Sequence, residues 1–401
     1  MAYARDEDWP EFIEQHERTF MESETISATD LADLRRLIHD DDLLLVRDAS
    51  RSTPGRVVGS SMFFRLGLTV PGGRVVEAPG LTGVTVAATD RRRGILRGMM
   101  AELVSRWESE HFPVAMLNAT EATIYERFGF GPATYADRIE IPTTKARLRA
   151  PAPVEPSTWF ATGGEVDKHL PEIHRRWAAT YPGAVHRTPE YWAPLLADTT
   201  LMRSSSAGPV HRLLHDDGYA AFRFERGDNG QRLLVSEVFA LTPQAHTELW
   251  RVMLSTDLIS GVQALVPLDD PLRAKLVDFR AVQGAGAVDM VWLRILDVPA
   301  ALRMRTYRGD LDVVLEVHDQ LRDSTDTFGL SVRDGVAEVS RSSSKPTVRL
   351  ELSDLGSIYL GGLRARALAD AGRLWTDSEA TLDALDTAFS TTVAPFSGTM
   401  F

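Results

Sequence analysis

Val-Thr-Val-Ala-Ala-Thr-Asp-Arg-Arg-Arg-Gly-Ile-Leu-Arg, residues 84 to 97, is the stretch that decides the fold of this chain. A β-type run ends at Val86, a basic turn follows, and a helix is predicted to begin near Ile95. We expect Asp90 to cap that helix and Gly94 to let the backbone approach an anionic ligand. The free N–H groups, the helix dipole and the arginines can then all stabilise one bound anion, as a pyrophosphate site requires. The alternative is a surface turn whose arginines lie over acidic neighbours.

Length and composition limit the classes of protein that this sequence can form. A chain of 401 residues predicts two or three domains. The 44 basic and 56 acidic side chains give a formal charge of −12, which argues against general nucleic-acid binding and favours cationic partners such as polyamines or basic peptides. Cysteine is absent, which excludes disulfides and thiolate nucleophiles. No apolar run approaches the length of a membrane span and no signal peptide is evident, so we expect a cytoplasmic protein.

Further helices and strands are predicted on both sides of the basic turn, and their order along the chain is informative. Two helical patterns lie within residues 9–40, and three strand-like runs follow at residues 42–47, 56–66 and 74–88. After the basic turn come a helix to about Trp107, a strand at residues 114–117 and a short helix that contains Tyr125. This ααβββαβα order resembles the fold of the GCN5-related N-acetyltransferases.

The basic turn itself resembles the loop by which those acetyltransferases hold the pyrophosphate of acetyl-CoA. Arg91-x-x-Gly94-x-Leu96 is similar to their Gln/Arg-x-x-Gly-x-Gly/Ala motif, although Leu96 stands where a small residue is usual. The resemblance implies that acetyl-CoA is the co-substrate. The residues predicted to bind it are Val84, Thr85, Val86, Arg92, Arg93, Gly94, Ile95, Leu96, Arg97, Thr120 and Glu121.

The rest of the chain is predicted to form a second copy of this fold and a third domain of another type. In the second copy, the strand at residues 235–241 runs into Thr-Pro-Gln-Ala-His-Thr-Glu, residues 242–248, without the arginines or the glycine. We therefore expect one cofactor site per chain. Strand patterns at residues 311–318, 335–340 and 347–352 precede a segment, residues 354–362, that resembles the helical entry of sterol-carrier-like domains.

The predicted fold class is thus α+β, with two tandem acetyltransferase-like domains and a sterol-carrier-like domain. The expected boundaries are residues 1–150 for the catalytic domain, 151–296 for the degenerate copy and 297–401 for the third domain. Ala-Pro-Ala-Pro-Val-Glu-Pro, residues 150–156, is predicted to be an extended linker.

Two residues are candidates for proton donor and proton acceptor. Residues 124–133 resemble the tyrosine-glycine-phenylalanine segment of these acetyltransferases, so Tyr125 is the predicted proton donor to the departing thiolate. The alternative is that Tyr125 and Phe128 are core residues. Backbone N–H groups of the Val84–Val86 strand are predicted to stabilise the oxyanion.

The proton acceptor follows from a closer resemblance. The domain order, the basic turn, residues 182–192 and the apolar ending Ala-Pro-Phe-Ser-Gly-Thr-Met-Phe at residues 394–401 resemble the enhanced intracellular survival protein family of actinobacterial acetyltransferases. In that family the terminal carboxylate reaches the active site of the first domain, which implies the α-carboxylate of Phe401 as proton acceptor. The alternative for any terminus is a frayed tail. Residues 182–192 can belong to a substrate channel or to a contact between domains.

The resemblance implies an acetyl-CoA-dependent N-acetyltransferase that assembles as a homohexamer. Its acceptors are expected to be polycationic amines, namely aminoglycosides and lysine side chains. We expect the protein to bind no nucleic acid and to have no membrane span. A non-catalytic acyl-CoA or lipid-binding carrier or sensor is the alternative. No metal is expected, because His211 and His215 share a strand face without a suitable third ligand.

Overall fold

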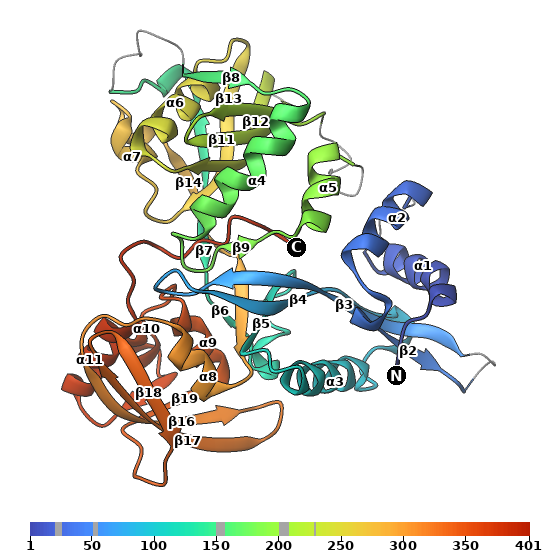
Figure 1. Ribbon diagram of the computed structural model, residues 1–401, viewed down its shortest axis with the longest axis vertical. Helices are drawn as coiled ribbons and strands as arrows, with labels where there is room; N and C mark the ends of the chain where they lie inside the picture. The colour runs from blue at the N-terminus through green and yellow to red at the C-terminus, as the bar shows by residue number, and fades with distance from the viewer. Residues whose placement is uncertain (21–25, 51–54, 150–156, 200–207, 228–229) are drawn as a thin grey trace.

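The computed structural model describes residues 1–20, 26–50, 55–149, 157–199, 208–227 and 230–401. Three mixed β-sheets, each carrying helices, make up this part of the chain (Figure 1). The predicted α+β class with three units is therefore confirmed. The linker expected at residues 150–156 lies outside the described residues. No helix within the described ranges is long and apolar enough to cross a membrane.

The first sheet is built mainly by the N-terminal part of the chain. Its strand order is β1-β2-β3-β4-β5-β15-β6, and β9 pairs with β3. The elements are β1 (Ala2–Tyr3), α1 (Trp9–Phe20), α2 (Ala28–Leu37), β2 (Leu43–Asp48), β3 (Arg56–Thr69), β4 (Val75–Val86), α3 (Ile95–Ser109), β5 (Val114–Asn118), β6 (Gly131–Pro132), β9 (Val185–His186) and β15 (Val291–Ile295). Ser27 caps α2 by accepting a hydrogen bond from the Asp30 N–H, and Asp30 completes a capping box.

Strands β4 and β5 form a fork in the middle of this sheet. They run parallel and pair only at Gly80 with Met116 and at Leu81 with Leu117. Beyond that point β4 continues to Val86 along β3 alone, through an irregularity near Gly83, whose φ is +59°. The two strands therefore part at the end of β4 that leads into α3.

The second sheet is built from the middle of the chain and from one strand of its N-terminal part. Its order is β14-β7-β13-β12-β11-β10-β8. The elements are β7 (Tyr135–Pro142), β8 (Thr158–Phe160), α4 (Gly164–Ala178), α5 (Pro189–Ala197), β10 (His211–His215), β11 (Gly218–Gly227), β12 (Gly230–Ala240), α6 (Pro243–Leu254), β13 (Ile259–Pro267), α7 (Leu272–Lys275) and β14 (Gln283–Asp289).

The first two sheets exchange strands across the boundary expected near residue 150. Strand β7 lies before that boundary but pairs with β13 and β14 of the second sheet. Strand β15 lies after it but pairs with β5 and β6 of the first sheet. Each of the two sheets is thus completed by sequence from the other unit.

The third sheet, in the order β18-β17-β16-β19-β20, belongs to the C-terminal unit. Its elements are α8 (Val298–Met304), β16 (Leu311–Asp319), β17 (Ser324–Arg333), β18 (Val336–Arg341), β19 (Val348–Glu351), α9 (Leu352–Tyr359), α10 (Ala365–Asp370), β20 (Leu374–Thr376) and α11 (Glu379–Phe389). Every residue of α9 is buried, because this helix lies between the third sheet and β15 and β6 of the first.

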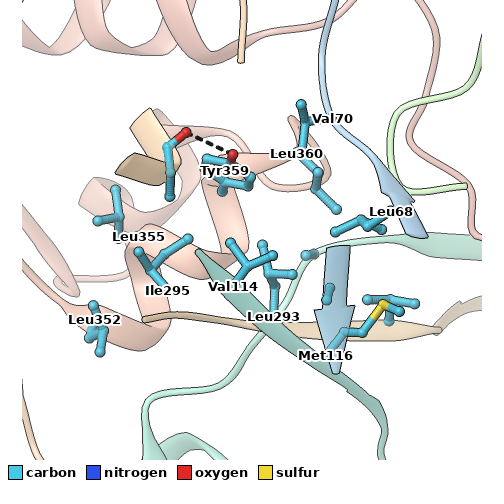
Figure 2. Packing of buried hydrophobic residues seen from close by; sticks show 14 of the residues in the cluster. Leu68, Val70, Val114, Met116, Leu293, Ile295, Leu352, Leu355, Tyr359 and Leu360 are labelled. Atoms are coloured by element: carbon cyan, nitrogen blue, oxygen red, sulfur yellow. Dashed lines mark hydrogen bonds between the residues drawn. The ribbon is translucent and has the colours of Figure 1, made fainter. Parts of the chain in front are cut away.

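One apolar core joins the first and third units. Leu293 and Ile295 of β15 pack with Leu352 and Leu355 of α9 in the same buried cluster (Figure 2). The phenol of Tyr359 donates to the Ala301 carbonyl at 2.8 Å, as the dashed line in Figure 2 marks. The third unit is therefore fixed to the first by a continuous hydrophobic interior.

Candidate active site

The basic turn has the backbone of an anion cradle. Helix α3 begins at Ile95 as predicted, and Gly94 at its N-cap has a φ of +78°. An added Cβ at Gly94 would meet no atom within 4 Å, so the turn opens onto free space. The first N–H groups of α3 have no partner within the helix and carry the positive end of its dipole. This geometry fits a pyrophosphate.

The prediction that Asp90 caps this helix is wrong. The N-cap is Gly94, and no side chain accepts a hydrogen bond there. Asp90 is buried and instead forms ion pairs with Arg93 and with Arg56, the latter at 2.8 Å. A hydrogen bond from the Thr89 hydroxyl, followed by these guanidinium groups, holds the pKa of Asp90 below its usual value. Asp90 therefore anchors the turn to β3 and does not cap the N-terminus of α3.

The arginines of the turn differ in their surroundings. Arg91 and Arg92 are exposed, and neither forms an ion pair with any other described residue. Arg93 is engaged by Asp90 and lies 3.6 Å from Asp48. The Nη2 of Arg97 donates to the Leu321 carbonyl of the third unit at 2.8 Å.

The fork between β4 and β5 leaves backbone donors facing its gap. The Ala87 N–H donates to the Val58 carbonyl of β3 at 2.9 Å. Because successive N–H groups of a strand point to opposite sides, the Val86 N–H points away from β3, toward the side that β5 has left. The neighbouring residue, Thr85, contacts β3 through its side chain, whose hydroxyl lies 2.7 Å from that of Ser60. Within the predicted run, the N–H of Val86 thus has a direction that suits a ligand in the fork.

Tyr125 lies at the start of a short 3₁₀ helix, η4 (Glu126–Phe128), that follows β5. Its side chain is 8% exposed and packs in the cluster that contains Leu81, Leu117 and the buried face of α3. Burial raises the pKa of the Tyr125 phenol, and the nearby Glu121 carboxylate raises it further. The phenol therefore keeps its proton at neutral pH. Glu121 itself is exposed.

The C-terminal segment is docked, not frayed. It runs past β9 to an end beside the first sheet (Figure 1). The Phe401 N–H donates to Oδ1 of Asn118, the last residue of β5, at 3.1 Å. The Phe401 ring covers Gly80 so closely that a Cβ there would lie 2.8 Å from its Cε2 atom. The chain therefore ends at the point where β4 and β5 part.

The segment at residues 182–192 holds this terminus in place. The Arg187 Nε donates to the Thr399 hydroxyl at 3.0 Å, and its Nη2 donates to the Gly398 carbonyl at 3.2 Å. The Tyr191 hydroxyl donates to the Met400 carbonyl at 2.6 Å. This segment therefore forms a contact between units, and its residues Arg187, Tyr191 and Trp192 also line a cavity described below.

The sequence analysis assigned no individual role to three residues that form or contact the terminus. Asn118 is the polar end of an otherwise buried strand, and its Nδ2 donates to the Met290 carbonyl at 2.9 Å, which fixes its oxygen toward Phe401. Arg187 is buried against Glu237, with which it forms an ion pair. Gly398 has a φ of +63°, and its neighbours leave no room for a side chain. Arg187 and Gly398 lie in the two segments singled out from the sequence, and a glycine near a chain end also suits a tight turn, whereas Asn118 carried no signal.

Phe401 and Tyr125 lie on opposite faces of the fork. Gly80 and Leu81 are adjacent in β4, so their side-chain positions point to opposite faces of the sheet. Phe401 covers the Gly80 face, whereas Tyr125 packs in the cluster of Leu81. A group held in the fork thus has the terminal residue on one side and the phenol on the other.

The corresponding turn of the second unit is closed by its own side chains. Helix α6 begins at Pro243, and the Thr242 hydroxyl caps it by accepting from the Ala245 N–H. The Lys275 ammonium donates to the Pro243 carbonyl at 2.8 Å and to the Thr247 hydroxyl at 2.9 Å. This helix start has neither the left-handed glycine nor the open space found at Gly94.

A cavity of about 350 Å³ lies beside the terminal segment in the second unit. Its walls come from α5, from β12 and β13 where these two strands part, and from the last residues of the chain. Trp192, Phe239 and Met400 supply apolar surface. The Glu237 carboxylate in its wall is paired with Arg187 and accepts from the Tyr219 hydroxyl at 2.9 Å.

Comparison with known proteins identifies the units. Residues 1–133 and 183–328 each match a family model described as an acetyltransferase (GNAT) domain, and residues 298–398 match a sterol carrier protein domain. The chain is 36% identical over 398 residues to the N-acetyltransferase Eis of Mycobacterium bovis, covering 97% of this chain and 96% of the relative. It is 34% identical over 368 residues to an uncharacterized N-acetyltransferase of Streptomyces griseus, covering 86% and 87%.

Solved structures agree with this assignment. The crystal structure of Eis1 from Mycobacterium abscessus has a TM-score of 0.86 and 28% identity, covering 99% of this chain and 98% of that one. A GCN5-related N-acetyltransferase from Anabaena variabilis shares the fold, with a TM-score of 0.84 over 100% and 99% of the two chains at 21% identity. Acetyltransferases of the GNAT class use acetyl-CoA. The fork, the glycine-headed helix and these relatives together show that the chain belongs to the Eis family of N-acetyltransferases.

Proposed function

We propose that this protein transfers the acetyl group of acetyl-CoA to amines of polycationic acceptors at the fork between β4 and β5, by direct attack and without a covalent enzyme intermediate. The observation that carries the proposal is the position of the fork, between the Gly94 turn and the docked C-terminus. When bound, acetyl-CoA supplies the activated acyl group as a thioester. The protein positions this acyl group and provides the groups that transfer protons.

The cofactor site follows from the backbone of the turn. The N–H groups at residues 95–97 and the guanidinium of Arg92 suit the pyrophosphate, because the helix dipole and a charged donor act on the same anion. Arg93 shapes the turn through its ion pair with Asp90. The Val84–Val86 strand lines the fork, where the N–H of Val86 suits the thioester carbonyl.

The other predicted cofactor residues border the same fork. Thr120 and Glu121 are exposed just after β5, on the side where the two strands have parted. Leu96 is partly buried against the cluster that contains Tyr125, so its bulk is directed into the protein and not into the turn. A leucine is therefore compatible with the cradle at this position.

The two proton transfers are assigned to opposite faces of the fork. Tyr125 donates a proton to the departing thiolate, since its raised pKa keeps the phenol protonated. The α-carboxylate of Phe401 accepts a proton from the ammonium of the acceptor, which frees the neutral amine to attack the thioester. Three hydrogen bonds to residues 398–400 and one from the Phe401 N–H hold the terminal residue at the fork, which supports this assignment.

The acceptor class rests on charge and on family. The formal charge of −12 favours cationic acceptors, and we infer aminoglycosides and lysine side chains as the two classes. The cavity of about 350 Å³ beside Met400 adjoins the terminus and offers room for part of such an acceptor. We also propose the homohexamer that the family resemblance implies, and sedimentation of the full chain measures it.

Release of free coenzyme A thiol tests the proposal without background, because the chain has no cysteine. Acetyl-CoA is mixed with polyamines, aminoglycosides or lysine peptides, and a thiol reagent follows the reaction. We expect amine-dependent thiol release that falls in Tyr125→Phe and in a chain extended by one glycine after Phe401. Binding of acetyl-CoA without release for any amine would support the carrier alternative. Unchanged rates in both variants would contradict the assigned proton transfers.

A further inference from the structure

Arg294 is a fully buried charged residue of β15, next to the end of the strand. Its Nη1 donates to the Phe128 carbonyl at 2.6 Å, at the end of the turn that carries Tyr125. Its Nη1 and Nη2 also donate to the two carboxylate oxygens of Asp319, at 3.2 and 2.6 Å. Asp319 is the last residue of β16 in the sterol-carrier-like domain. One guanidinium thus ties the Tyr125 turn to the third domain.

The backbone that follows Tyr125 packs closely against this guanidinium and against α9. Gly129 follows Phe128 with a φ of +77°, and an added Cβ there would collide with the Arg294 Nη1 atom. Gly131 is in contact with α9 in the same way, since its Cβ would collide with the Ser353 carbonyl oxygen. The segment after Tyr125 therefore lies as close to Arg294 and to the third domain as a glycine backbone allows.

A second ion-pair network joins the same two parts of the molecule. Glu126 follows Tyr125 directly, and its carboxylate accepts from the Arg373 Nη1 at 2.8 Å. The Nη2 of Arg373 lies 2.7 Å from Oδ1 of Asp354, a residue of α9 that is 1% exposed. Both ends of the short helix η4 are thus held by charged side chains bound to the third domain.

The connection between β16 and β17 adds an apolar contact. Leu321, two residues after Asp319, is 6% exposed and belongs to the buried cluster of Tyr125 and Phe128. Asp319 orients this turn, because its Oδ1 accepts from the Leu321 N–H at 3.0 Å. The side chain of Leu321 therefore brings the third domain into the buried cluster in which the proposed proton donor packs.

The Tyr125 hydroxyl forms no hydrogen bond with any other described residue. Packing and the path of its backbone therefore set its direction. We propose that Arg294, Asp319 and Leu321 are positioning residues, through which the sterol-carrier-like domain holds the Tyr125 phenol at the fork. The proposal rests on the role of Tyr125 given under the proposed function. It makes the third domain a working part of the active site of the first.

A double-mutant experiment on the full chain tests this proposal. Asp319→Asn keeps the shape of the side chain but removes the charge that orients Arg294. We expect kcat for thiol release to fall by about tenfold or more, but by no more than the 10²–10⁴-fold loss expected when the general acid itself is removed, while KM for acetyl-CoA changes little. In the Tyr125→Phe background the same substitution should cost no further activity, because the group that it positions is already gone.

Asp386→Asn provides a matched control. Asp386 is as buried as Asp319, at 6% against 9% exposed, and its carboxylate accepts from the Arg364 Nε at 3.0 Å within the third domain. We expect this variant to keep its kcat. Glu126→Ala, at a partly exposed site, replaces Asp319→Asn if the latter fails to fold, and should show the same dependence on Tyr125.

Each outcome decides a separate question. A full kcat in Asp319→Asn, or an equal loss with and without the Tyr125 hydroxyl, overturns the positioning role. An equal fall in Asp386→Asn also overturns it, since loss of the charge of any buried carboxylate in the third domain would then suffice. Equal rates for the wild type and Tyr125→Phe would instead contradict the proposed proton donor itself. A fall in Asp319→Asn that disappears in Tyr125→Phe supports the proposal.

Discussion

Substitution of Gly94 by alanine separates ligand binding from folding at the basic turn. Gly94 has a φ of +78°, so an alanine there adopts the left-handed conformation at a cost of about 1 kcal/mol in unfolding free energy. The new methyl group meets no protein atom within 4 Å, so no packing penalty adds to this cost. The methyl group instead stands where an anion approaches the first N–H groups of α3.

The expected loss of affinity follows from the hydrogen bonds at stake. A hydrogen bond to a charged group contributes about 1.5–3 kcal/mol, and tenfold in affinity corresponds to about 1.4 kcal/mol. Displacing the pyrophosphate from one N–H group should thus weaken acetyl-CoA binding by about 10- to 100-fold. The thermal midpoint should fall by only a few degrees.

Gly372→Ala is the matched control for backbone strain. Gly372 follows α10 in the third domain with a φ of +73°, and its Cβ would also meet no atom within 4 Å. Calorimetric titration gives the dissociation constant of acetyl-CoA, and scanning calorimetry gives the thermal midpoint. Both variants should melt at similar temperatures, whereas only Gly94→Ala should bind more weakly. Wild-type affinity in Gly94→Ala, or an equal loss in Gly372→Ala, would refute the reasoning.

Three further predictions concern pH and packing. Because the Glu121 carboxylate helps to raise the pKa of Tyr125, Glu121→Gln should move the alkaline limb of the kcat profile to lower pH; an unmoved limb would contradict this coupling. Burial raises the pKa of Asp354 to about 6, so the folded state binds more protons than the unfolded state between about pH 4 and pH 6. The wild type should therefore lose stability as pH rises through that range, and Asp354→Asn should lose less; parallel curves from urea unfolding would argue against this linkage. Gly131→Ala places a Cβ against the Ser353 carbonyl and should lower the unfolding free energy by about 1–3 kcal/mol, which an unshifted urea midpoint would disprove.

Local sequence patterns predicted the main helices and strands of the first unit, but not its strands β1, β6, β9 and β15. Runs rich in Val, Leu and Phe between turn residues predicted β3 and β4, and the glycine of the basic turn predicted the start of α3 near Ile95. These signals are local, because residue composition, turn residues and a left-handed glycine depend only on neighbouring positions. The resemblance of the basic turn to the acetyltransferase loop added the fold class.

The exchange of β7 and β15 between sheets has no such local signal. Val291–Ile295 is buried throughout and reads as an ordinary core strand, whichever sheet it joins. Its partner β5 lies more than a hundred residues earlier, and pairing over that distance is decided by the packing of the assembled units. Periodicity predicts that a strand exists, not which edge it completes.

The same reason explains the errors and omissions at the site. Asp90 reads as a helix cap because it precedes the helix, yet its charge is engaged by Arg56, 34 residues away. Asn118 lies 283 residues from the Phe401 N–H that it binds. The apolar ending of the chain indicated that the terminus would be buried, but its partners became visible only in the folded structure.

The most direct test of this account is the number of acetyl-CoA molecules bound per chain. The account places one cofactor at the Gly94 turn and none at the start of α6, which Thr242 and Lys275 close. Calorimetric titration of the wild-type chain should therefore give a stoichiometry of one. Two sites per chain, or no heat of binding at all, would contradict the central claim.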